Sequence, residues 1–275
     1  MPAYGLKLLL SFVERSPDII QVFLDQDLLL TLAGISQAHS GNMSPSLMQN
    51  MVGLLECVVS SKDIDISSLY EQGLIDTVTS LFVDVAAAMN GERIDRDNFA
   101  VSLLPLLDTV NNILKNLSKE VRRAIQAKHQ GEPDSEEVGQ FAEKLLLESK
   151  PLAELTGVLI NFLCHEDEEV QDCSCRTLYL VAELFGGVCE DVMSFNSVEC
   201  LAEALAYPDV KRQKQLLRII KRFLTSNPQH AATLAQNGQL LIDSLAKLRT
   251  IENSSAEGLA IKGLVEEIFV KVRIK

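Results

Sequence analysis

One predicted helix, spanning residues 209–225, carries the clearest concentration of positive charge in the chain. Its cationic and amide side chains recur at intervals of three, four and seven residues, so they share one side of the helix. The members of this basic row are Lys211, Lys214, Gln215, Arg218 and Arg222. Guanidinium and ammonium groups bind carboxylates, so the basic row would suit an acidic peptide. An ordinary solvated helix face is the alternative interpretation.

A second polar row lies on the predicted helix at residues 102–116 and just beyond it. It contains Asn111, Asn112, Lys115 and Lys119. Asparagine side chains on a groove helix can hold an extended peptide by its backbone amides, although an ordinary exposed face explains the pattern more simply. Asn112 and Lys115 are therefore secondary candidates for partner binding.

The cysteines and histidines offer a metal site or a redox site only in principle. Zinc binds four thiolate or imidazole ligands, usually as two close pairs, and the pairs here are Cys164-His165 and Cys173-Ser-Cys175. Residues two apart on a helix point away from each other, and the Cys-x-x-Cys form of redox pairs is absent. Small buried thiols of a reduced cytosolic protein explain the pattern better, so we expect no metal and no cofactor.

Catalytic motifs are equally scarce. The sequence has no Gly-rich phosphate loop, no His-Arg-Asp catalytic loop and no Asp-Phe-Gly. None of the four histidines has a serine or cysteine nucleophile that its sequence context would pair with it. The acidic run at residues 166–169 lacks the spacing and glycine of a calcium loop, and it suits the N-terminus of a helix. We therefore expect no enzyme activity in this chain.

The composition limits the partners and the fold. The 275 residues are 47% hydrophobic but only 5% aromatic, and leucine dominates, which favours helices over sheets. A net charge of −13 repels phosphate backbones and anionic membranes, so nucleic acid is an unsuitable partner. No uncharged apolar stretch is long enough to span a membrane, and the short apolar segment at residues 5–13 lacks the features of a signal peptide.

Helical periodicity runs along nearly the whole chain. Apolar residues recur every three to four positions, for example at residues 47–58, 103–117 and 216–224. Ser44-Pro45 and Asn227-Pro228 read as N-caps followed by a proline at the first helical position. No alternating pattern is long enough for a strand, so the sequence predicts an all-α fold.

A repeated plan organises these helices: a capped short helix, a turn, and then an apolar helix. The turn positions Asp27 and Gly73 are 46 residues apart, Ser197 and Gly238 are 41 apart, and the 124 residues between Gly73 and Ser197 fit three such periods. Periods of about 40–47 residues are typical of armadillo and HEAT repeats. We therefore predict an armadillo-like, alternatively HEAT-like, right-handed superhelical solenoid of roughly five to six repeats.

Two segments carry a narrower resemblance. Residues 227–238 resemble the short-helix junction of armadillo repeats, whereas residues 28–35 and 170–184 resemble the C-terminal repeat tail in the fourth branch of the Unc-fifty-one-like serine/threonine kinases. The resemblance implies a cytoplasmic scaffold that binds an extended protein in a concave groove, with cytoskeletal (microtubule) or ciliary partners. As the alternative, it implies repeats that regulate or dock onto a kinase domain that this chain lacks.

The polar segment at residues 127–140 interrupts the period, since it is acidic and holds a proline and two glycines. We expect an N-terminal repeat array at 1–126, a mobile acidic loop at 127–140 and a C-terminal array at 141–275 stacked on the first. Residues 6–13 read as the last helix of a repeat already under way. An uncapped repeat exposes apolar surface, so we also expect self-association through this end.

Overall fold

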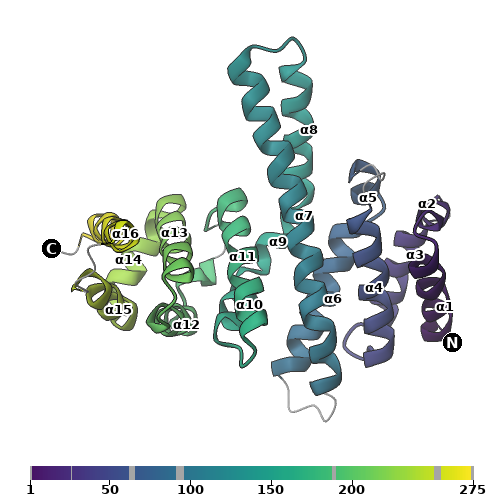
Figure 1. Ribbon diagram of the computed structural model, residues 1–275, viewed down its shortest axis with the longest axis horizontal. Helices are drawn as coiled ribbons and strands as arrows, with labels where there is room; N and C mark the ends of the chain where they lie inside the picture. Colours follow the sequence, from purple (N-terminus) through teal and green to yellow (C-terminus); the bar gives the residue numbers. More distant parts are fainter. Residues whose placement is uncertain are drawn as a thin grey trace. The chain divides into compact units, whose positions relative to one another are not determined.

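The computed structural model describes residues 2–25, 27–61, 66–90, 96–187, 190–250 and 255–273. Every regular element in these ranges is a helix, and they contain no strand (Figure 1). The all-α prediction is confirmed. The chain divides into two compact units, Met1–Leu155 and Thr156–Lys275.

The helices of the first unit are α1 (Pro2–Arg15), α2 (Ile19–Leu24), α3 (Leu28–His39), α4 (Pro45–Ser60), α5 (Ile66–Glu71), α6 (Leu74–Asn90), α7 (Arg96–Gln130), α8 (Ser135–Glu148) and α9 (Pro151–Glu154). Those of the second unit are α10 (Thr156–Asn161), η1 (Phe162–Cys164), α11 (Glu168–Phe185), η2 (Glu190–Met193), α12 (Phe195–Ala206), α13 (Val210–Ser226), α14 (Pro228–Asn237), α15 (Gln239–Thr250) and α16 (Ala256–Val272).

Local capping explains where several of these helices begin. The hydroxyl of Ser44 accepts a hydrogen bond from the backbone N–H of Leu47 at 3.4 Å, and Pro45 follows at the first helical position. Asn227 caps α14 in the same way, since its Oδ1 accepts from Gln229 N at 2.9 Å. These side chains satisfy backbone donors that have no partner within the helix.

The helices follow a three-helix order in both units. In the first, short α2 precedes α3 and α4, and short α5 precedes α6 and α7; the third helices α1, α4 and α7 pack in series. In the second, short η2 precedes α12 and α13, and short α14 precedes α15 and α16; the third helices α11, α13 and α16 again pack in series. Three helices per repeat, rather than two, mark an armadillo-like fold.

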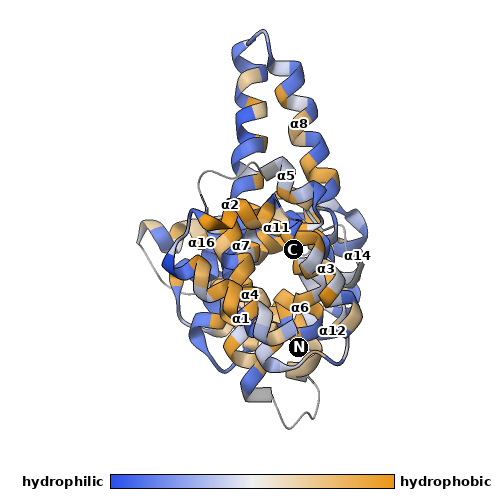
Figure 2. Ribbon diagram, turned by 90° about the vertical axis from the view of Figure 1, so that its right-hand side faces the viewer, coloured by the Kyte–Doolittle hydropathy of each residue, from blue (hydrophilic) through white to orange (hydrophobic). Residues whose placement is uncertain are grey.

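A helical hairpin replaces most of the loop predicted at 127–140. The helix α7 continues to Gln130 and α8 begins at Ser135, so residues 131–134 alone lie outside helices. Ala127 and Ala142 are buried where the two helices pack. This contact stabilises helical turns that the polar sequence of the segment does not favour by itself. The hairpin extends beyond the other helices of its unit, and its tip is largely hydrophilic (Figures 1 and 2).

This hairpin also accounts for the long spacing between two of the predicted turns. Two third helices, α7 and α11, occur between Gly73 and Ser197, and the hairpin supplies the remaining length that the period assigned to another repeat. The division between the compact units falls after Leu155 rather than within 127–140. The base of α8 is held by α5, because Lys144 Nζ lies 2.9 Å from Glu71 Oε1 and Ser149 Oγ lies 3.0 Å from Tyr70 Oη.

One apolar ridge of the first unit faces away from its core. Tyr4, Leu8 and Phe12 follow one another at intervals of four along α1 and are 81%, 59% and 49% exposed. Leu6 and Val13, on the opposite side of the helix, are buried, where α1 packs against α4. We call the exposed residues the α1 ridge.

Candidate partner-binding surface

The helix α13 lies between α11 and α16 and presents the basic row outward. Its apolar side is buried, with Leu216, Ile220 and Phe223 essentially inaccessible. Asp209 caps the helix, because its carboxylate accepts from the backbone N–H of Lys211 at 2.8 Å. α13 is the third helix of its repeat, and the basic row lies on its solvent-facing side.

The five members of the basic row differ in what they contact. Arg222 donates to the main chain at the end of α11, with Nε 3.4 Å from Ala182 O and Nη2 3.2 Å from Glu183 O. Gln215 donates to Cys175 O at 3.4 Å. Carbonyls in the last turn of a helix lack the usual intrahelical partner, and Arg222 supplies one to Glu183 O, whereas Ala182 O also accepts from the backbone N–H of Gly186 at 3.0 Å.

The remaining three cations of the row are available for a ligand. Lys211 and Arg218 are exposed and Lys214 is half-buried. Among the described residues, the guanidinium of Arg218 has no hydrogen bond or ion pair. The flanking Lys221 is already paired, because its ammonium contacts the carboxylate of Glu267 on α16.

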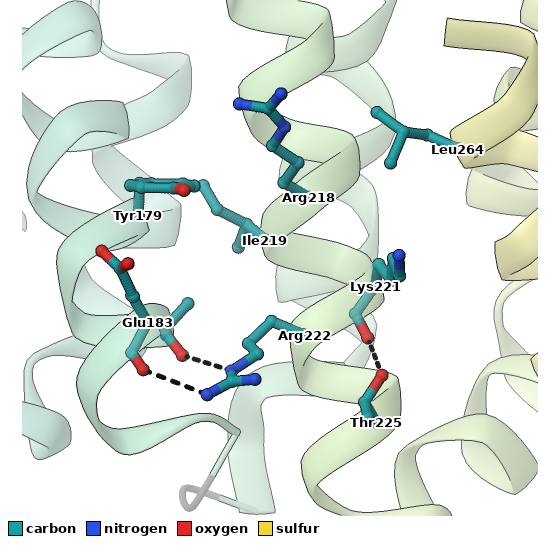
Figure 3. A pocket seen from close by; sticks show the side chains of 9 residues that line it. Tyr179, Glu183, Arg218, Ile219, Lys221, Arg222, Thr225 and Leu264 are labelled. Atoms are coloured by element: carbon teal, nitrogen blue, oxygen red, sulfur yellow. Dashed lines mark hydrogen bonds between the residues drawn. The ribbon is translucent and has the colours of Figure 1, made fainter. Parts of the chain in front are cut away.

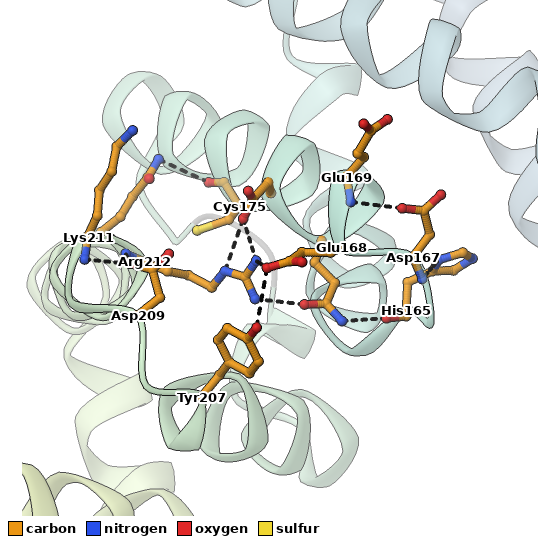
Figure 4. Close-up of polar contacts among 12 residues, drawn as sticks. His165, Asp167, Glu168, Glu169, Cys175, Tyr207, Asp209, Lys211 and Arg212 are labelled. Atoms are coloured by element: carbon orange, nitrogen blue, oxygen red, sulfur yellow. Dashed lines mark hydrogen bonds and ion pairs between the residues drawn. The ribbon is translucent and has the colours of Figure 1, made fainter.

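Arg212, the neighbour of Lys211 in the sequence, is buried and holds α13 against α11 (Figure 4). Its Nε donates to Asp172 Oδ1 at 3.1 Å and its Nη1 to Gln171 Oε1 at 2.7 Å. Its guanidinium carbon lies 4.9 Å from the centre of the Tyr207 ring, in a cation–π contact. Arg212 is therefore a structural residue and not part of a binding surface.

A cleft of about 450 Å³ opens along the third helices (Figure 3). It is lined from α13 by Arg218 and Arg222 of the basic row, from α11 by Tyr179 and Glu183, and from α16 by Leu264. Buried Ile219 forms part of its lining. The cleft therefore combines unpaired positive charge with apolar surface, which suits a peptide better than a free anion.

A smaller cleft of about 130 Å³ lies nearer the start of α13. Lys211 and Gln215 line it from α13, and Asp172 and Arg176 line it from α11. The carboxylate of Asp172 therefore lies close to Lys211, whereas exposed Arg176 adds a cation that the sequence analysis missed. The spacing of Asp172, Arg176, Tyr179 and Glu183 along α11 was the available signal, because it is that of one helix face.

The secondary candidates lie in the other unit. Asn112 is half-buried and Lys115 is exposed on α7, whereas Asn111 is 2% exposed and so does not line a surface. α7 belongs to the unit Met1–Leu155 and α13 to the unit Thr156–Lys275. Asn112 and Lys115 therefore belong to a different compact unit from the basic row, and their role in binding stays a prediction.

The cysteines occupy helix interiors. Cys173 and Cys175 are buried, and burial raises the pKa of the Cys175 thiol to about 12. Cys164 donates to Cys200 O at 3.4 Å. Within the described ranges, no three His, Cys, Asp or Glu side chains gather as a metal site would need, and Cys189 lies outside those ranges.

The acidic run at 166–169 begins a helix, as predicted. The carboxylate of Asp167 accepts from Glu169 N at 2.8 Å and caps α11, while Asp167 N donates to His165 Nδ1 at 3.0 Å (Figure 4). Over the part of the chain that the structure describes, no helix is both long and apolar enough to cross a bilayer.

The comparisons with known proteins agree with this picture. The chain is 34% identical over 248 residues to the serine/threonine-protein kinase ULK4 of Mus musculus. The match covers 88% of this chain but only 18% of ULK4, and it lies in the repeat part of that protein, outside its kinase domain. The chain is a relative of the repeat tail of ULK4. The resemblance to the Unc-fifty-one-like kinases is confirmed, and the chain is not their catalytic part.

No protein-family model matches the chain. Among solved structures, it resembles an engineered protein (Northeast Structural Genomics Consortium target OR329) with a TM-score of 0.49 and 14% identity, over 98% of this chain and 90% of the other. It also resembles the designed armadillo repeat protein YIII(Dq)4CqI with a TM-score of 0.48 and 13% identity, over 98% and 92% of the two chains.

Proposed function

We propose that this chain is a protein-interaction scaffold that binds an extended acidic segment of a partner across α11, α13 and α16. The observation that supports this function most directly is the outward basic row in a chain whose net charge is −13. A helix that collects cations against the trend of the whole chain favours a partner of opposite charge. Its cleft adds apolar surface to that charge.

A binding experiment with an acidic peptide library tests the proposal. The variant Lys214→Glu/Arg218→Glu reverses two of the three cations of the row whose side chains do not bond to the main chain, whereas Arg222 is left intact because it bonds to the end of α11. The matched control, Lys128→Glu/Lys247→Glu, changes the net charge equally at exposed positions elsewhere. We expect salt-sensitive binding that the first variant loses and the control keeps. If both variants lost binding equally, binding would depend only on the net charge of the chain and not on the basic row.

A second candidate function follows from the similarity to ULK4. Since the chain spans only 18% of that kinase and matches its repeat part, its repeats would regulate or dock onto a kinase domain. Cytoskeletal or ciliary partners in the cytoplasm belong to the same proposal. Co-sedimentation with microtubules, and pull-down with a separately expressed kinase domain of ULK4, would distinguish these partners.

The α1 ridge supports a further proposed contact, the self-association of this chain. Three large apolar side chains in one row are more than the scattered exposed residues of a typical surface. A second copy of the chain could cover the row by packing a helix against α1.

A further inference from the structure

Contacts between the third helices fix which of their residues lie side by side. Arg222 bonds to the main chain of Glu183, and these residues come four positions after Arg218 and Tyr179. Lys221 pairs with Glu267, and these come three positions after Arg218 and Leu264. The row of Tyr179, Arg218 and Leu264 therefore crosses three adjacent helices at one level. All three residues line the same cleft (Figure 3).

The cations that line this cleft differ in whether a neighbour already holds them. Lys221 pairs with Glu267, and Arg222 bonds to the main-chain carbonyls of Ala182 and Glu183. Arg218, by contrast, has no hydrogen bond or ion pair among the described residues, and Tyr179 and Leu264 beside it are uncharged. Its guanidinium is therefore the one in this cleft that can take a carboxylate without giving up another contact.

The spacing of the row matches that of a peptide in the extended polyproline II conformation. Packed helices have axes about 8–10 Å apart, and a polyproline II peptide advances about 3.1 Å per residue, so about three peptide residues span one helix-to-helix step. Because this conformation has about three residues per turn, a peptide that crosses α11, α13 and α16 presents every third side chain to successive members of the row.

We infer that the row of Tyr179, Arg218 and Leu264 reads an extended peptide with one carboxylate side chain, flanked about three residues away on each side by an apolar side chain. The carboxylate binds the guanidinium of Arg218, whose planar donors suit it. The apolar side chains cover the Tyr179 ring and the Leu264 side chain. This inference rests on the proposed function and specifies the partner sequence that it requires.

The test uses four fluorescein-labelled heptapeptides measured by fluorescence anisotropy. The first has leucine at both ends, glutamate in the centre and serine elsewhere; the second has glutamine in the centre. The third rearranges the first so that both leucines adjoin the glutamate, and the fourth is seven glutamates. Arg218→Gln is the test variant, and Lys247→Gln is its control because it removes the same charge from an exposed position on α15, outside the basic row.

We expect the first peptide to bind at least about tenfold tighter than the second, since a charge-assisted hydrogen bond carries that difference. The third peptide keeps the glutamate but should also bind more weakly than the first, because its leucines no longer reach Tyr179 and Leu264. Arg218→Gln should remove the preference for glutamate over glutamine, whereas Lys247→Gln should change binding by less than about twofold. Thermal unfolding of both variants should match the parent chain, because neither side chain bonds to its neighbours among the described residues.

The possible failures are distinguishable. If heptaglutamate binds as tightly as the first peptide and Lys247→Gln weakens it as much as Arg218→Gln does, binding depends on the overall charge of the chain. The specific pattern is then wrong, although the proposed scaffold function stands. If neither these peptides nor the acidic library binds, the proposed function fails as well.

Discussion

The Nε of Arg212 on α13 lies 3.1 Å from the carboxylate of Asp172 on α11, and this pair joins two successive third helices. The side chain of Arg212 is 4% exposed and that of Asp172 is 51% exposed. Gln171, Glu168 and the ring of Tyr207 also contact the guanidinium. A buried cation depends on all of these partners, because water cannot replace them.

Removal of this guanidinium should therefore weaken the second unit. We expect Arg212→Ala to lower the free energy of unfolding by about 2–3 kcal/mol, the lower end for a buried pair because Asp172 is half exposed. Urea unfolding followed by circular dichroism measures the loss. The neighbouring exposed Lys211→Ala should change stability by less than about 0.5 kcal/mol. Equal effects of the two substitutions would contradict a structural role for Arg212.

Arg218 and Arg222 are similar in sequence but should separate in experiment. Arg222→Ala removes donors to Ala182 O and Glu183 O, so we expect a loss of about 1 kcal/mol in unfolding free energy. Arg218→Ala should leave stability within about 0.5 kcal/mol while weakening the binding of acidic peptides. Denaturation and peptide titration on the same samples check both. The idea fails if Arg218→Ala is the more destabilising change.

Tyr70 should make the first unit sensitive to alkaline pH. Burial raises the pKa of its hydroxyl to about 12, although the hydrogen bond from Ser149 opposes the shift. The ordinary pKa is 10.0, so between these values only the unfolded chain ionises. The stability that the neutral hydroxyl of Tyr70 contributes is fully present below pH 10 and is lost as the pH rises toward about 12. This loss lowers the free energy of unfolding by up to about 3 kcal/mol.

The measurement is the unfolding free energy at about pH 8 and about pH 11, on either side of the ordinary tyrosine pKa. Tyr70→Phe should lose less stability over this interval than the parent chain. Tyr4→Phe, at an exposed tyrosine, should keep the full dependence. If Tyr70→Phe kept the pH dependence of the parent chain, the loss of unfolding free energy would come from the titration of other groups.

Gly187 should tolerate no side chain. Its N–H donates to Ser226 Oγ at 2.6 Å, and its carbonyl lies 2.8 Å from Nε2 of buried His230. A Cβ there would lie 3.1 Å from the backbone Cα of Phe223, which cannot move aside alone. We expect Gly187→Ala to cost about 1–3 kcal/mol in unfolding free energy.

The matched control is Gly157→Ala in α10, where an added Cβ meets no heavy atom within 4 Å. Alanine favours a helix over glycine, so this change should stabilise by up to about 1 kcal/mol. Thermal unfolding of the two variants should shift in opposite directions. A shift in the same direction would show that contacts at Gly187 are looser than the distances indicate.

The α1 ridge should drive concentration-dependent association. We expect sedimentation velocity to detect dimers or larger species of the parent chain, and Tyr4→Glu/Leu8→Glu to reduce them, since burial of these side chains supplies the attraction. Leu147→Glu, at an isolated exposed leucine of α8, is the control. A parent chain that stays monomeric at high concentration would contradict the prediction.

The helices and their caps followed from sequence because the interactions that form them are local. Ser44 and Asn227 reach backbone donors two or three residues away, and apolar periodicity needs no knowledge of the partner. The segment 127–140 escaped this reasoning. Its proline and glycines suggested a loop, yet packing between α7 and α8 extends both helices, and that contact joins residues on opposite sides of the turn.

The identity of the binding residues depended on contacts that no local pattern contains. By type and spacing, Arg218 and Arg222 are equivalent members of the basic row. They differ because the register of α13 against α11 places Arg222 beside the main-chain carbonyls at the end of α11. The register of α13 against α16 likewise pairs Lys221 with Glu267. That register results from the packing of many side chains distant in sequence, so periodicity identifies a basic helix face but not which of its charges stays free.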